Sequence, residues 1–254
     1  MATRTETSSR RRGAIGFVTL CAAVLGGAAA LAPLADAGNT EPHVLGQTKK
    51  NPRALCPQEP SESQNPTTIT RPCFVIGSVT GFELKADGER HVMRAPTDGT
   101  IVSWAVQLAE PNKLERNAFG ADNFFGTKRY GKEATGRIGV LAARKAGTYK
   151  LVRQSPTVKL DQSFGELHYV TLAKPLKIKK GEIVALTTQT WIPALTTSQF
   201  APQSTWRASR NPKKCNGKAN AINATPQTKV GSTRGYGCIF TARLLYWAYY
   251  VPSR

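Results

Sequence analysis

The chain lacks most of the motifs that mark a known kind of catalytic or metal site. Its 254 residues contain no Cys-x-x-Cys pair, no Gly-x-Ser-x-Gly turn and no glycine-rich phosphate loop ending in Lys-Ser/Thr. These absences speak against a cysteine zinc site, a hydrolase nucleophile elbow and a P-loop. Only His43, His91 and His168 occur, and none forms the His-x-His pair of cupin-type metal barrels. We therefore expect neither a cofactor nor a bound metal ion.

The remaining catalytic candidates fall in one short stretch. Asp161, Ser163 and His168 are the residue types of a hydrolytic triad, but closeness in sequence says little about geometry. Glu166 and His168 lie two residues apart on an expected strand and share a face, where a solvated or salt-bridged pair is commoner than a metal site. The sequence predicts that the protein is not an enzyme. A secreted hydrolase with its site on a loop is the alternative.

The first residues have the layout of an export signal. Arg10, Arg11 and Arg12 precede an apolar run over 14–34, which ends at the small-x-small sequence Ala35-Asp36-Ala37. We expect residues 1–37 to be a signal peptide cleaved after Ala37, with a retained membrane anchor as the other interpretation. Residues 38–70, rich in proline and polar residues, then form an extended or disordered lead-in, and 71–254 form one domain. The mature protein is predicted to be extracellular, with no membrane span and an oligomeric state that the sequence leaves open.

Acidic residues are scarce. The signal segment carries four arginines and two acidic residues, so the mature chain keeps 31 basic against 14 acidic residues and a net charge of +17. Such a charge attracts polyanions, although a merely solvated basic surface is the commoner meaning. Export makes nucleic acid an unexpected partner, so the expected partner is a polyanion or a cell-envelope polysaccharide.

Four cysteines remain after the signal segment, an even number in an exported chain: Cys56, Cys73, Cys215 and Cys238. Three pairings are possible. We favour Cys56–Cys73 and Cys215–Cys238, because each closes a short polar loop next to an expected strand. Each bond would stabilise the fold by roughly 3 kcal/mol by constraining the unfolded chain.

From Cys73 onward the hydrophobic pattern is that of short strands. Residues 101–108 alternate, with Val102, Trp104, Val106 and Leu108 on one face. Further strands are expected over 138–142, 149–154, 158–160, 167–172, 176–178 and 183–190, and one long aromatic strand over 238–251. No sustained 3.6-residue apolar stripe occurs. The pattern predicts an all-β fold, an antiparallel jelly-roll-like β-sandwich with long loops.

Part of this pattern resembles uncharacterised secreted actinobacterial proteins. The resemblance rests on Gly99-x-Ile101-x-x-Trp104, Ile138-Gly139-Val140-Leu141, the hairpin at Tyr149-Lys150-Leu151-Val152 and the strand from Gly181 to Leu186. It covers roughly residues 95–190. It implies a jelly-roll-like β-sandwich, and it carries over no activity and no functional residues.

Two long segments interrupt the strands, over 110–136 and 194–234, and long loops in a compact domain are often functional. Aromatic rings can lie flat against sugars, and clustered basic side chains bind anionic groups. The candidate ligand-binding residues are Trp191, Trp206, Arg207, Arg210, Lys213, Lys214 and Tyr236. They predict a protein that binds an anionic or carbohydrate component of the envelope or its surroundings. A structural or assembly module is a further alternative.

Overall fold

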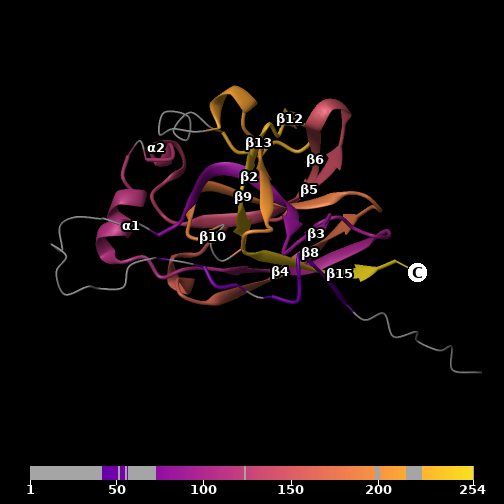
Figure 1. Ribbon diagram of the computed structural model, residues 1–254, viewed down its shortest axis with the longest axis horizontal. Helices are drawn as coiled ribbons and strands as arrows, with labels where there is room; N and C mark the ends of the chain where they lie inside the picture. Colours follow the sequence, from indigo (N-terminus) through magenta and orange to yellow (C-terminus); the bar gives the residue numbers. More distant parts are fainter. Residues whose placement is uncertain are drawn as a thin grey trace, which may run out of the picture. The chain divides into compact units, whose positions relative to one another are not determined.

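Two antiparallel sheets share one hydrophobic core in the computed structural model of the chain (Figure 1). The structure describes residues 42–50, 52–54, 56, 73–122, 124–197, 201–215 and 225–253, all within the unit Thr40–Arg254. The predicted signal peptide over 1–37 and most of the lead-in over 38–70 lie outside these residues. The predicted all-β antiparallel sandwich with long connections is confirmed.

The larger sheet has nine strands. Its order is β12 (Thr233–Gly235), β6 (Thr148–Gln154), β5 (Thr135–Ala143), β9 (Ile183–Ile192), β2 (Ile76–Ala86), β11 (Thr205–Ala208) and β13 (Cys238–Phe240), with β3 (Glu89–Arg90) on β2 and β7 (Val158–Lys159) on β5. The central strand β9 is buried along almost its whole length, which is why its sequence is a continuous run of β-branched and apolar residues.

The smaller sheet has four strands, in the order β1 (His43–Leu45), β15 (Tyr246–Pro252), β4 (Gly99–Gln107) and β8 (Leu167–Ile178). Trp104 and Val106 of β4 point into the core as the alternation predicts. Val102, which was predicted on the same face, does not point into the core. The register with β8 shifts between Ile101 and Ser103, and this bulge puts Ile101 in the core and leaves Val102 half-buried.

The end of the chain corrects one prediction. Instead of one long strand over 238–251, the structure has three short strands, β13, β14 (Ala242–Leu244) and β15, and each belongs to a different sheet. β14 pairs with β10 (Leu195–Thr197) in a separate two-stranded ribbon. The interruptions fall at Thr241 and Leu245, on either side of the fully buried Arg243. The chain therefore crosses from one sheet to the other within fifteen residues.

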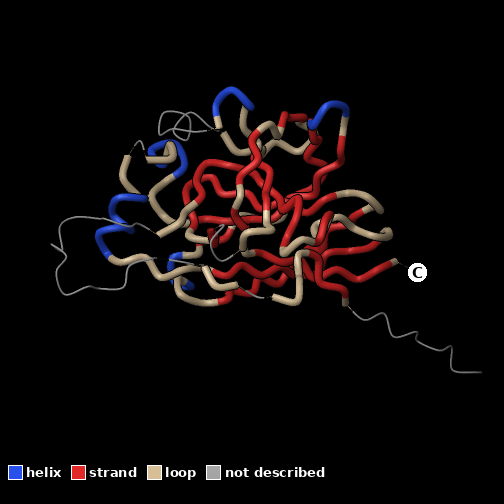
Figure 2. The backbone as a smooth tube through the Cα atoms, in the orientation of Figure 1, coloured by secondary structure: helices blue, strands red, loops and turns tan. Residues whose placement is uncertain are grey.

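Helices occupy the periphery (Figure 2). They are α1 (Lys113–Phe119), α2 (Thr127–Tyr130) and the 3₁₀ turns η1 (Lys145–Gly147), η2 (Asp161–Ser163) and η3 (Pro212–Lys214). The segment expected as a polar loop over 110–136 thus contains two helices, and Phe119 at the end of α1 packs on Trp191 with ring centroids 5.2 Å apart. Among the described residues, no helix has the length and apolar character needed to cross a membrane.

The two favoured disulfides, Cys56–Cys73 and Cys215–Cys238, are both present.

The lead-in is less irregular than expected, because His43–Leu45 forms β1 and pairs with Tyr250–Ala248 of β15. This pairing makes β1 an edge strand of the four-stranded sheet, and it was missed because three residues are too few to show an alternating pattern.

Candidate functional site

The predicted ligand-binding residues divide between the core and one surface pocket. Trp191 belongs to the core: it is 1 % exposed, stacks on Phe164 and donates its indole N–H to the Lys132 carbonyl at 2.9 Å. Filling the interior is the common role of aromatic side chains in a sandwich. Trp191 is therefore a core residue and does not line the surface pocket.

Trp206 is also buried, at 4 % exposure, and its ring stacks on Phe240 with centroids 4.9 Å apart. It lies on β11 next to Arg207, and neighbouring strand residues point to opposite faces. Trp206 and Arg210 border an apolar hollow of about 380 Å³, whereas Arg207 and Arg210 border a different, more polar pocket. Trp206 therefore shares a hollow with Arg210 but does not border the pocket that Arg207 lines.

That second pocket, of about 600 Å³, is the arginine pocket. Its lining residues are Gly147, Arg207, Arg210, Asn211, Pro212, Gly235, Tyr236 and Gly237. They come from the η1 turn, from β11 and the segment after it, and from the end of β12, elements that lie at the top of Figure 1. Three of the seven predicted ligand-binding residues, Arg207, Arg210 and Tyr236, thus meet in one place.

Both arginines are half-buried, and neither has an acidic neighbour in the pocket. Arg207 donates from Nη1 to the Tyr149 hydroxyl at 3.4 Å, and Arg210 donates from Nη2 to the Gly77 carbonyl at 3.2 Å. The Nε atoms of both side chains are buried and have no hydrogen-bond partner within the part of the chain that the structure describes. Among the described residues that line the pocket, none is acidic. Burial lowers the pKa of Arg210, because no carboxylate offsets the loss of water around its charge.

Tyr236 forms the floor of the pocket. Its hydroxyl donates to Gln227 Oε1 at 2.7 Å, and its ring packs edge-on against Tyr149 with centroids 5.0 Å apart. Burial raises the pKa of the Tyr236 hydroxyl, so this group stays neutral at physiological pH. Tyr236 therefore shapes the pocket and leaves its charge to the arginines.

The far wall is held by the Cys215–Cys238 disulfide. Cys215 follows η3, which contains Lys213 and Lys214, and Cys238 follows Gly237. Lys213 is exposed outside the pocket lining. A Cβ on Gly237 would lie 2.3 Å from Pro212 Cδ, so the close approach of these two segments requires glycine. The sequence did not single out the other lining residues, which are Gly147, Asn211, Pro212, Gly235 and Gly237. The two glycines that flank the predicted Tyr236 were the available signal.

The suspected triad does not assemble. Ser163 Oγ lies 2.8 Å from His168 Nδ1, but Asp161 accepts a hydrogen bond from the Ala134 backbone N–H at 2.9 Å and so anchors the start of β5. A serine nucleophile needs a base that is itself oriented by a third group. The carboxylate expected in that role is engaged elsewhere.

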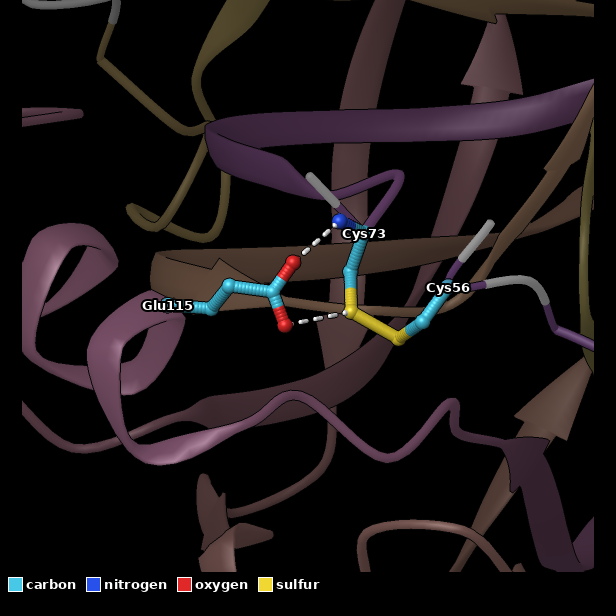
Figure 3. Close-up of side chains that lie close together, drawn as sticks. All are labelled: Cys56, Cys73 and Glu115. Carbon is cyan, nitrogen blue, oxygen red and sulfur yellow. Dashed lines mark hydrogen bonds between the residues drawn. A yellow bond between two sulfur atoms is a disulfide. The ribbon is translucent and has the colours of Figure 1, made fainter. Parts of the chain in front are cut away.

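A second group of potential ligand atoms surrounds the other disulfide (Figure 3). The buried Glu115 accepts from the Cys73 backbone N–H at 2.7 Å, and its Oε2 lies 3.2 Å from Cys73 Sγ (Figure 3). The same oxygen accepts from the Asn112 N–H at 2.8 Å. With Asn112 it forms the capping box of α1. Sulfurs joined in a disulfide offer no thiolate to a metal ion, so this cluster ties α1 to the disulfide.

Comparisons with protein-family models, with curated proteins and with solved structures found no match to this chain. The assignment of a function therefore rests on the geometry of the chain itself.

Proposed function

We propose that this is an exported, non-catalytic protein that binds an anionic component of the cell envelope or its surroundings through the arginine pocket. The observation that carries the proposal is the pair of half-buried guanidinium groups, Arg207 and Arg210, each bonded through one Nη to a neutral oxygen, with no acidic residue among the described residues that line the pocket. A phosphate, sulfate or carboxylate group would supply the missing acceptors.

The energetics favour an external anion. Two half-buried cations without a counter-charge are costly, and the lowered pKa of Arg210 reflects that cost. Each charge-assisted hydrogen bond to an anion returns roughly 1.5–3 kcal/mol. The surplus of basic residues over the whole chain, 35 against 16, draws anions in from a distance. Specific binding at the arginine pocket would then add to a general attraction.

The test separates these two contributions. The probe is dextran sulfate, with uncharged dextran as the reference ligand, and affinity is measured by calorimetry in about 0.05 M and about 0.5 M salt. Arg207→Gln/Arg210→Gln removes both guanidinium groups. Lys174→Gln/Lys177→Gln removes the same charge from exposed positions on β8, in the other sheet.

We expect the arginine double variant to bind dextran sulfate at least about tenfold more weakly, and the lysine control to stay within about threefold of the unaltered protein. Unfolding by urea checks that both variants keep their fold. Equal losses in the two variants would show that binding follows net charge alone, and the proposal would then be wrong.

A further inference from the structure

A second concave surface lies on the outer face of the four-stranded sheet. This groove, of about 320 Å³, is lined by Val44, Gln47, Pro52, Arg53, Gln107, Leu167, Tyr169, Trp247 and Tyr249. Trp247, Ala105 and Tyr169 are direct register partners across β15, β4 and β8, so they share one face of the sheet. Ala105 and Trp247 belong to a hydrophobic cluster separate from the core, which places that face outside the sandwich.

Exposed rings form one side of the groove. Tyr169 is 59 % exposed and Leu167 is 38 % exposed, both unusual for apolar side chains on a sheet. The Tyr169 and Tyr249 rings have centroids 6.0 Å apart and planes inclined by 42°. Burial, together with the neighbouring Tyr169 hydroxyl, raises the pKa of Tyr249 to about 12. The two rings lie next to each other and present an aromatic surface at the groove.

Short side chains of β4 lie next to these rings. Ala105 is fully buried between its register partners Trp247 and Tyr169, and Ser103 pairs with Tyr249 on one side and with Thr171 on the other. The rings therefore project beyond the middle strand, because Cβ atoms on paired strands lie only about 5 Å apart. A flat ring could lie against the tyrosines.

Hydrogen-bonding groups form the rim. Gln47 and Arg53 are exposed, and Gln107 is half-buried at the end of β4. The amides both donate and accept, and the guanidinium donates. Among the described residues that line the groove, none is acidic. The groove therefore combines aromatic faces with a ring of amide and guanidinium groups.

We propose that this groove binds a pyranose ring of a neutral polysaccharide, with an apolar sugar face on Tyr169 and Tyr249 and the hydroxyls on Gln47, Arg53 and Gln107. A pyranose has one face of C–H groups and an edge of hydroxyls, and this pairing matches the two kinds of lining group. The volume lies at the lower end for small-molecule sites. The inference is independent of the arginine pocket.

A second copy of the chain fits the groove less well. A stable interface buries about 800 Å² on each partner around an apolar centre. The exposed large apolar residues do not form such a centre: Leu167 and Tyr169 lie at the groove, whereas Ile239 lies on β13 in the other sheet. The patch at the groove is small and bordered by polar groups, which suits a sugar.

The test uses uncharged ligands, to which the arginine pocket offers no counter-charge. Cellohexaose, chitohexaose, maltohexaose and mannohexaose are titrated into the full protein by calorimetry. We expect at least one to bind, and Tyr169→Ala to weaken that binding about tenfold. Tyr169→Phe keeps the ring and should stay within about threefold. Ile239→Ala removes a comparably exposed side chain, 53 % exposed, and should have no effect.

Three outcomes would overturn the inference. None of the four oligosaccharides binds; or Tyr169→Ala and Ile239→Ala weaken binding equally; or sedimentation shows that Tyr169→Ala turns a dimer into a monomer while sugar binding stays unchanged. Arg207→Gln/Arg210→Gln should leave neutral-sugar binding intact, so failure at the groove is distinguishable from failure at the arginine pocket.

Discussion

Arg243 and the pair Arg207 and Arg210 are the same kind of residue in opposite situations. Arg243, 1 % exposed, forms an ion pair from Nη1 with Asp87 and donates to the carbonyls of Lys50, at 3.1 Å, and Gly46, at 3.3 Å. Arg207 and Arg210 border a pocket with no acidic side chain among its described lining residues, and their Nε atoms have no hydrogen-bond partner in the described segments.

The difference teaches how to distinguish a structural cation from a binding one. Arg243 has its counter-charge built into the fold, in the turn that joins β2 to β3, so its charge is used internally. Arg207 and Arg210 have bonds to one neutral oxygen each, at 3.4 and 3.2 Å, and their charge remains available. Removing the first kind should damage stability, and removing the second kind should damage binding.

The largest expected effect is on stability at Arg243. Arg243→Met should lower the free energy of unfolding by about 4 kcal/mol, because it leaves the half-buried Asp87 carboxylate without its cation. Urea unfolding measures the change. As the matched control, Arg210→Met should change the free energy of unfolding by less than about 1 kcal/mol, since it removes a half-buried charge that no carboxylate offsets. Equal losses of unfolding free energy in Arg243→Met and Arg210→Met would contradict the distinction between a structural and a binding arginine.

The Cys215–Cys238 disulfide gives the next effect. Cys215→Ala/Cys238→Ala should cost about 3 kcal/mol for a separation of 23 residues, and it should also weaken dextran sulfate binding because the bond holds one wall of the arginine pocket. Cys56→Ala/Cys73→Ala, with a separation of 17 residues, should cost a similar amount and leave binding unchanged. Loss of binding in both variants would mean that binding follows overall stability.

The smallest effect concerns Glu83, which lies beside Arg243. Burial raises the pKa of Glu83 well above its ordinary value of 4.5, more than the nearby Arg243 and the Leu244 N–H lower it. As pH rises from about 4.5, the unfolded chain loses this proton while the folded protein keeps it, so stability should fall with rising pH. Glu83→Gln cannot titrate and should flatten that decline, as seen in thermal unfolding between about pH 5 and 8.

The matched control is Glu89→Gln, an exposed carboxylate on β3, which should leave the pH profile of the unaltered protein in place. Glu83 Oε2 has no hydrogen-bond partner among the described residues, so the amide displaces no existing bond there. Parallel profiles for Glu83→Gln and the unaltered protein would show that Glu83 ionises normally in the folded state.

The architecture could be predicted well from the sequence, because the strands show their own pattern of apolar and β-branched residues. The two expected strands over 167–172 and 176–178 form the single strand β8, which accommodates Pro175 because it is an edge strand of its sheet. The turns at Gly147 and Gly181 were also predictable, since both have positive φ. Of the three possible cysteine pairings, the structure has the one that the sequence favoured, in which each bond closes a short polar loop next to a strand.

The sites were harder to predict, because they depend on contacts between distant segments. Arg207 meets Gly147 across the sheet, and Trp206 faces the opposite side, which a basic and aromatic cluster in sequence could not reveal. The outer groove joins Arg53, Gln107 and Tyr249 from three distant parts of the chain. The sequence around Arg243 does not indicate that this residue is buried, because its ion-pair partner Asp87 lies 156 residues away in the chain.

The sheet-crossing segment at the end of the chain has a consequence for folding kinetics. β13, β14 and β15 each complete a different sheet, and β15 pairs with β1 some 200 residues earlier (His43 with Tyr250). Contacts of such long range are slow to form, because the loop entropy is lost before the contacts are gained. The sandwich can therefore close only when residues 238–252 join it, and this closing step should set the rate of folding.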